Sequence, residues 1–103
     1  MSAERIRVEA RFEVQYVFAI SGRGGALAGR ILEGAVRPGM CTQPLEFAGA
    51  SAVLEVSAVE FADNVRTGES CVALLFTERP TARELGAAVR PGDVITLTPP
   101  IGS

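Results

Sequence analysis

Residues 17–39 read VFAISGRGGALAGRILEGAVRPG, and this stretch decides the fold. It holds the end of one apolar segment, a loop with three glycines in five residues at 21–25, and a second apolar segment at 26–32. Because glycine adopts positive φ and permits close backbone approach, the loop predicts a β-hairpin. Gly29 lies inside the return strand, where a glycine often marks a bulge or a tight bend of a barrel.

The segment before the loop alternates with the two-residue period of a β-strand. Every even position from 6 to 20 is apolar, and the odd positions from 7 to 15 are Arg, Glu, Arg, Glu and Gln. This segment exceeds the usual strand length of about five or six residues. We therefore expect a bend near Ala10 or Phe12 that lets the strand serve two sides of a barrel. Val17 and Ala19 make the outer face apolar too, which predicts that this half is covered on both faces or contacts a partner.

A short turn pattern recurs along the chain, as VRPG at 36–39, VRTG at 65–68 and VRPG at 89–92. The two proline copies fit type II turns, in which proline takes the second position and glycine the third. Strand-like runs follow at 41–47, 71–77 and 94–98, and another strand or strand pair is expected at 51–61. The only helix candidate is PTARELG at 80–86, with Thr81 as its cap, Glu84 three residues later and Gly86 as its end.

These elements predict an all-β fold, a small closed antiparallel β-barrel of six to seven strands with one short helical turn. A chain of 103 residues is long enough for one domain and too short for two. We expect a single domain over 1–103, with the barrel at about 5–98 and a tail at 99–103 that frays.

Charge and hydropathy narrow the classes of partner. All ten basic residues are arginine, the net charge is −2 and the sequence pI is about 5.1. Domains that grip a nucleic-acid backbone are usually basic, so extended RNA-backbone binding is not expected and no DNA partner is predicted. A pocket for one nucleotide or an RNA chain end is compatible with this charge. No apolar run approaches the roughly 20 residues that span a bilayer, and the charged N-terminus does not resemble a signal peptide. We therefore expect a cytoplasmic protein with no membrane partner.

The residue types give little support to catalysis or metal binding. Cys41 and Cys71 are thirty residues apart, no C-x-x-C spacing occurs and the chain has no histidine, so neither a zinc site nor a nucleophile with a histidine base is indicated. We expect two reduced, buried thiols, because a disulfide needs facing strands and an oxidising compartment. The chain also has no lysine, which excludes a GxxxxGK[ST] phosphate-binding loop. No enzymatic activity, metal or cofactor is predicted.

A series of short motifs resembles the second domain of the translational GTPases, the elongation factor Tu group. The motifs are VFAISGRG at 17–24, GR at 29–30, VEF at 59–61, GESCVAL at 68–74 and VRPGDVI at 89–95. Their order and rough spacing agree with that domain from residue 12 to residue 97. Because only sixteen residues precede the first motif, we expect a standalone barrel without the GTPase domain.

The resemblance implies a domain that binds rather than catalyses. In that family the barrel contacts the acceptor end of aminoacyl-tRNA, packs on the GTPase domain and meets the small ribosomal subunit. By position, Glu60 matches a residue beside the pocket for the terminal adenosine, and Arg23 with Gly22 and Gly24 matches the loop that faces partners. The family's asparagine after Gly-Glu is Ser70 here, and the loop after VEF is short, so delivery of charged tRNA is not expected.

Two local interpretations and two functions stay open. Residues 22–25 form either an anion-binding nest with Arg23 above it or a plain hairpin turn. Glu60 forms either a small polar pocket with Arg66 or Arg30, or an ordinary surface ion pair. The chain is either a non-catalytic binding module that contacts the tRNA 3′ end, rRNA, the ribosome or a translation GTPase, or a protein-interaction or structural barrel with no RNA role. The sequence does not indicate the oligomeric state.

Overall fold

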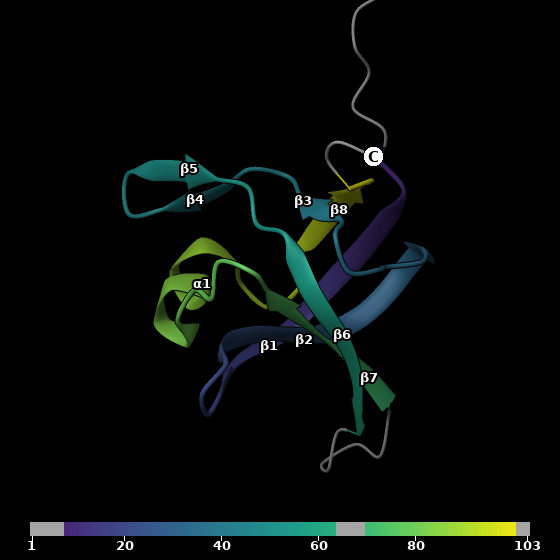
Figure 1. Ribbon diagram of the computed structural model, residues 1–103, viewed down its shortest axis with the longest axis horizontal. Coiled ribbons are helices and arrows are strands. Elements are labelled where there is room, and N and C mark those ends of the chain that lie inside the picture. The colour runs from purple at the N-terminus through teal and green to yellow at the C-terminus, as the bar shows by residue number, and fades with distance from the viewer. Residues whose placement is uncertain (1–7, 64–69, 101–103) are drawn as a thin grey trace, which may run out of the picture.

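The computed structural model describes residues 8–63 and 70–100, which form two antiparallel sheets and one short helix (Figure 1). The elements are, in chain order, β1 (Ala10–Ile20), β2 (Gly24–Gly34), β3 (Cys41–Thr42), β4 (Leu45–Phe47), β5 (Ala50–Ala52), β6 (Val56–Asp63), β7 (Ser70–Phe76), α1 (Ala82–Ala88) and β8 (Val94–Thr98). The larger sheet has the order β3-β8-β1-β2-β7-β6, and β4 pairs with β5 in the smaller one. The prediction of a mostly β chain with one short helix is confirmed.

β1 and β2 form a long hairpin with two register shifts, one between Arg11 and Phe12 and one between Val14 and Tyr16. The first lies where the sequence predicts a bend. The second inserts one extra residue into β1, so the side chains beyond it change faces. Val17 therefore packs against the core, and the prediction that it lies on the outer face is wrong.

Two glycines of β2 lie where other parts of the backbone come close. A Cβ at Gly29 would be 1.8 Å from the carbonyl oxygen of Glu13, beside the second register shift, as the glycine in the strand predicts. A Cβ at Gly25 would be 2.7 Å from the backbone nitrogen of Ala82. The Gly25 amide also donates to the Pro80 carbonyl at 2.7 Å, so the hairpin packs directly against the start of α1.

Both VRPG segments are turns of the predicted geometry. The glycine has a φ of 97° in the first and 95° in the second. In each, the amide of the residue after the glycine donates to the arginine carbonyl, at 3.2 Å and 3.0 Å respectively. The VRTG copy at 65–68 lies outside the described residues.

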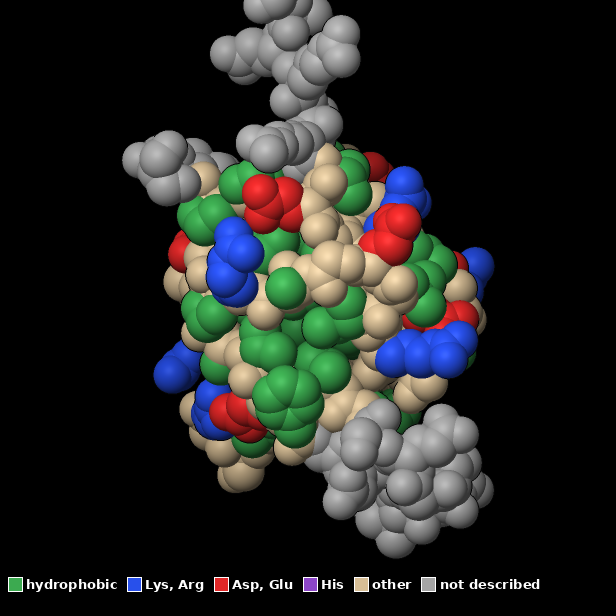
Figure 2. Space-filling view, turned by 90° about the vertical axis from the view of Figure 1, so that its right-hand side faces the viewer, with side chains coloured by type: hydrophobic (Ala, Val, Ile, Leu, Met, Phe, Trp, Pro, Cys, Tyr) green, Lys and Arg blue, Asp and Glu red, His purple; other side chains and the backbone are tan. Residues whose placement is uncertain are grey.

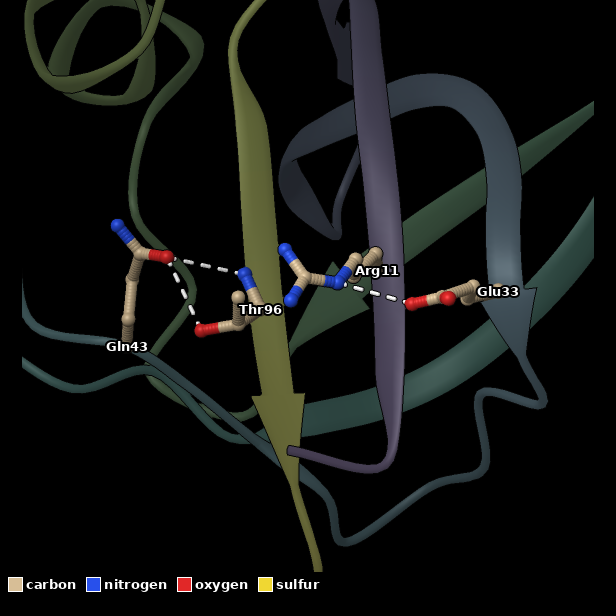
Figure 3. A network of polar contacts seen from close by, with 4 residues as sticks. All are labelled: Arg11, Glu33, Gln43 and Thr96. Carbon is tan, nitrogen blue, oxygen red and sulfur yellow. Dashed lines mark hydrogen bonds and ion pairs between the residues drawn. The ribbon is translucent and has the colours of Figure 1, made fainter. Parts of the chain in front are cut away.

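The strand predicted at 41–47 is two separate strands, β3 and β4. Pro44 lies between them and has no N–H to donate to a strand ladder, which explains the break. Gln43 instead joins this linker to β8, because its Oε1 accepts from the Thr96 amide at 3.0 Å and from the Thr96 hydroxyl at 3.1 Å (Figure 3). The segment at 51–61 contains two strands, β5 and β6, which do not pair with each other: β5 pairs with β4 and β6 with β7.

Helix α1 begins at the predicted cap. The Thr81 hydroxyl accepts from the Glu84 amide at 3.0 Å, and the Glu84 carboxylate accepts from the Thr81 amide at 2.9 Å. The prediction that Gly86 ends the helix is wrong, since Leu85 is buried in the core and the Val89 amide still bonds to its carbonyl at 2.9 Å. No helix within residues 8–63 and 70–100 is long and apolar enough to cross a membrane.

The core lies between the inner face of the larger sheet and α1. Its fully buried large side chains are Phe12, Phe76, Leu27, Met40, Leu74, Leu85, Ile95, Leu97, Val14 and Val56. Both cysteine thiols are buried as well, as predicted. Among the described residues Thr42 is the one buried polar side chain, and its hydroxyl accepts from the Leu54 amide at 3.0 Å. The interior formed by the described residues is thus apolar.

The larger sheet has two ends, β3 and β6, and no closed barrel is detected among the described residues. Backbone hydrogen bonds nevertheless link the chain around β3 to the start of β6. The Val56 amide donates to the Met40 carbonyl at 2.8 Å, and the Thr42 amide donates to the Leu54 carbonyl at 2.9 Å. The two ends of the sheet therefore meet over a short length.

Candidate functional site

The loop between β1 and β2 holds Arg23, which the sequence predicts as a partner-facing residue. Gly22 and Gly24 on either side of it have φ of 78° and 91°, a region that other L-residues rarely adopt. The Arg23 amide donates to the Ile20 carbonyl at 2.9 Å. The arginine side chain leaves this tight turn towards β6, where its Nη1 lies 2.8 Å from Glu60 Oε2.

The Arg23–Glu60 ion pair brings together two residues to which the family resemblance assigned separate binding roles. Their side chains are 43% and 45% exposed, so a ligand can reach both charges. Exposed ion pairs of this kind contribute about 0 to 1 kcal/mol to stability. A ligand that replaces one partner of the pair would therefore cost the fold little.

The other predicted site residues lie apart from this pair. Arg30 faces Glu13 directly in the register of β1 and β2, and its Nε lies 2.8 Å from Glu13 Oε1. The alternative pairing of Glu60 with Arg30 is therefore wrong. Ser70 opens β7 opposite Asp63, and its side chain lies outside the described part of the structure, as does all of Arg66.

The anion-nest interpretation of residues 22–25 is also wrong. A nest needs successive backbone N–H groups that point at the ligand. Here the Arg23 amide bonds to Ile20 and the Gly25 amide bonds to Pro80. The plain hairpin turn is what the structure contains, and any anion at this loop must be bound by side chains.

Two cross-strand rows form the outer face of the sheet next to the ion pair. By register, the first row is Tyr16, Ala28, Ala73 and Glu60, and the second is Phe18, Ala26, Leu75 and Ala58. The alanines of β2 and β7 and the leucine are buried. The rings of Tyr16 and Phe18 lie with their centroids 5.7 Å apart. The centre of this face is therefore a buried apolar floor, with the aromatic rings at the β1 margin and the Arg23–Glu60 pair at the β6 margin.

The Tyr16 hydroxyl forms a hydrogen bond with the thiol of Cys71 in β7. Burial, and then the hydrogen bond and charge interaction with the Cys71 thiol, raise the pKa of Tyr16 above its ordinary value. The phenol is therefore neutral at physiological pH. It adds a polar edge to an aromatic surface.

A cavity of about 330 Å³ adjoins Arg23 and shares Ala58 and Leu75 with the second row. Its polar lining residues are Arg23, Ser57, Thr77 and Arg79, and apolar residues of β6 and β7 form the rest. Sequence reasoning missed Arg79. It precedes the helix motif at 80–86 and belongs to none of the motifs in the sequence, and its place depends on how the hairpin loop packs against the segment before α1.

A second kind of surface feature is apolar. On the face shown in Figure 2, hydrophobic side chains form a continuous area with arginine and acidic side chains around it. Among the described residues the most exposed large hydrophobic side chain is Phe61 of β6, which is 80% exposed. The Phe61 ring therefore presents an aromatic surface to the solvent.

Comparisons with known proteins add no family. No protein-family model matches the chain, and a search of curated proteins finds no similar sequence. Among the described residues, no three His, Cys, Asp or Glu side chains are grouped so as to hold a metal ion. The features that bear on function are therefore the motif series and the geometry around Arg23.

Proposed function

We propose that the chain is a non-catalytic, cytoplasmic binding module of the elongation factor Tu domain 2 type, which contacts the 3′ end of tRNA, rRNA or a translation GTPase. The Arg23–Glu60 ion pair carries the proposal. The resemblance assigns one of these residues to the partner-facing loop and the other to the terminal-adenosine pocket. Their side chains lie 2.8 Å apart at the surface.

The outer face supports the same proposal through its chemistry. A nucleobase stacks on aromatic or flat apolar surfaces, and its edge needs polar groups. The exposed Tyr16 ring, with Phe18 beside it, offers the aromatic surface, and the Arg23–Glu60 pair offers the polar groups. A single base fits this combination better than a long phosphate backbone, which agrees with the acidic pI of about 5.1.

We further propose that the sheet closes into the barrel of that family. The backbone hydrogen bonds of Met40 and Thr42 with residues 54–56 support this closure. Closure fixes the position of β6 relative to β1 and β2. The distance between Glu60 and the hairpin loop would then be set by the fold rather than by the side chains.

A protein-interaction role is the second candidate, and Phe61 favours it. The side chain is 80% exposed, and hydrophobic side chains gather on the face in Figure 2. Interfaces are enriched in aromatic anchors that are buried when the partner binds. Such a role needs no contact with RNA.

A tagged pull-down from native lysate, divided into RNase-treated and untreated halves, tests the proposal. The expected result is rRNA or tRNA in the untreated half that is lost from an Arg23→Ala bait. Arg11→Ala is the matched control, because Arg11 forms an ion pair of similar length with Glu33, at 2.9 Å. A discrete protein that survives RNase and depends on Phe61 would favour the protein-interaction role instead.

A further inference from the structure

The cavity beside Arg23 has a lining that is suited to an anion. Four residues with side chains that donate hydrogen bonds, Arg23, Arg79, Ser57 and Thr77, are among those that line it. No carboxylate side chain is part of the lining. Guanidinium and hydroxyl groups are all able to donate to the same oxygen-rich ligand.

The fold brings the two arginines together through a backbone contact. Gly24 packs so closely on the next segment that a Cβ there would be 3.5 Å from the Arg79 Cα and 3.1 Å from the Pro80 carbonyl oxygen. The Gly25 amide bonds to the same carbonyl at 2.7 Å. The residue after the hairpin loop and the residue before Pro80 are therefore fixed side by side.

Arg79 holds an unusual backbone conformation at this contact. Its φ is 53°, in the left-handed region that favours glycine. The turn that produces it is closed by a hydrogen bond from the Arg79 amide to the Phe76 carbonyl at 3.1 Å. Residues in such conformations cluster at sites that bind ligands, because the surrounding structure has to impose them. An arginine at a position suited to glycine leaves its guanidinium at the cavity.

The charges around the cavity are not balanced. Arg23 is paired with Glu60. Within residues 8–63 and 70–100, the Arg79 side chain makes no ion pair or hydrogen bond. The neighbouring Glu78 carboxylate is turned to the Glu55 amide, which it accepts at 2.9 Å. Arg79 therefore brings to the cavity lining a positive charge that pairs with no carboxylate among the described residues.

We propose that this cavity binds a phosphate group, held by the Arg23 and Arg79 guanidinium groups and the Ser57 and Thr77 hydroxyls. Arginine matches phosphate because its planar fork donates two hydrogen bonds to two phosphate oxygens at once. The site goes beyond the proposed function, because it binds a phosphate whether or not a nucleobase occupies the outer face. The phosphate belongs either to a free phosphorylated small molecule or to the end of an RNA strand.

Titration of the ¹⁵N-labelled chain with inorganic phosphate, followed by NMR, tests the site at constant ionic strength set with sodium chloride. We expect saturable shifts of the amides of Ser57, Thr77 and Arg79. Arg79→Gly is expected to weaken binding about tenfold, because it removes a charge-assisted donor pair. This variant suits the positive φ and so keeps the fold. Arg79→Lys keeps the charge without the fork and should lie between the two.

Arg90→Ala is the matched control, since Arg90 is exposed and its side chain makes no ion pair among the described residues. It should bind phosphate like the unaltered chain. Shifts that do not saturate, or that Arg79→Gly and Arg90→Ala weaken equally, would overturn the site. So would shifts that chloride alone reproduces.

Two further probes separate this site from the proposed function. Adenosine monophosphate and a short RNA ending in CCA, each with and without a terminal phosphate, identify the source of the phosphate. RNA binding that is indifferent to Arg79→Gly, with no saturable binding of inorganic phosphate, would overturn the phosphate site and leave the RNA role standing. Inorganic phosphate binding without any RNA binding would support the site and reject the RNA role.

Discussion

The two ends of the β1–β2 hairpin carry the same residue types in different surroundings. At the end away from the loop, three arginines each pair with a glutamate: Arg11 with Glu33 at 2.9 Å, Arg30 with Glu13 at 2.8 Å and Arg37 with Glu9 at 3.2 Å. Figure 3 shows the first of these, and both of its side chains are exposed. At the loop end, Arg23 pairs with Glu60 beside a cavity, and Arg79 adds a guanidinium charge with no ion-pair partner among the described residues.

The two ends show that the surroundings of an ion pair, and not the pair itself, distinguish a candidate binding site. The pairs at both ends are exposed and of similar length, so neither end is distinguished by pairing energy. The loop end alone combines an apolar floor, a cavity and a residue at positive φ. These features come from the second register shift in β1 and from the packing of Gly24 and Gly25 on residues 79–82.

The largest effect is expected at the glycine that separates the two ends. Gly29→Ala should destabilise the chain by about 3 kcal/mol or more, because the new methyl would overlap the Glu13 carbonyl oxygen and force the hairpin backbone apart. Urea unfolding measures the change. Gly86→Ala is the control, since nothing lies within 4 Å of a Cβ there, and it should stabilise the helix by about 0.5 to 1 kcal/mol. Equal effects of the two substitutions would contradict the close approach at the bulge.

Replacing one arginine at each end of the hairpin tests whether binding is confined to the loop end. Arg23→Ala should weaken partner binding by at least about 1 kcal/mol and change thermal stability very little, because the ion pair is exposed. Arg11→Ala should leave both properties almost unchanged. Isothermal titration calorimetry with the captured partner and thermal unfolding give the two measurements. A large loss of stability in Arg23→Ala with binding intact would make Arg23 a structural residue.

The strained residue at the loop end offers an effect of opposite sign. Arg79→Gly should stabilise the chain by about 0.5 to 1 kcal/mol, because relief of the left-handed conformation exceeds the entropy that glycine adds to the unfolded chain. Arg79→Ala keeps the strain and should show no such gain in chemical unfolding. If alanine stabilises as much as glycine, the φ at this position is not the cause.

The smallest effect concerns Tyr16, the one tyrosine of the chain. Its pKa is raised in the folded state by burial and by the Cys71 thiol, whereas the unfolded chain ionises at about 10. The neutral phenol therefore contributes stability below about pH 10, and this contribution is lost as the pH rises through the folded pKa. Ultraviolet titration of the phenolate should give a pKa above that of a free tyrosine. In Cys71→Ala the pKa should fall part of the way back; an unchanged pKa would exclude the contact with the thiol.

Local sequence signals predicted much of the fold. The VRPG turns, the hairpin loop and the Thr81–Glu84 cap depend on neighbouring residues, and each is present. The apolar–polar alternation of the sequence did not predict that Val17 faces the core. Its side chain changes face because β1 has an extra residue between Val14 and Tyr16, at the place where Gly29 of β2 comes close to Glu13.

The candidate site was predictable only in part. Arg23 and Glu60 followed from the family resemblance, and their contact required the paired order of β1, β2, β7 and β6. Arg79 gave no signal, because its position is set by a tertiary contact with Gly24. The pairing of Arg30 with Glu13 rather than Glu60 likewise depends on strand register.

In our proposal the loop end of the hairpin binds RNA and the opposite end does not. NMR mapping of a short RNA that ends in CCA compares the two ends in one titration. We expect saturable shifts at residues 20–25 and 58–60 that Arg23→Ala weakens and Arg11→Ala preserves. Shifts centred on Arg11 and Glu33, or no saturable shifts at either end, would contradict it.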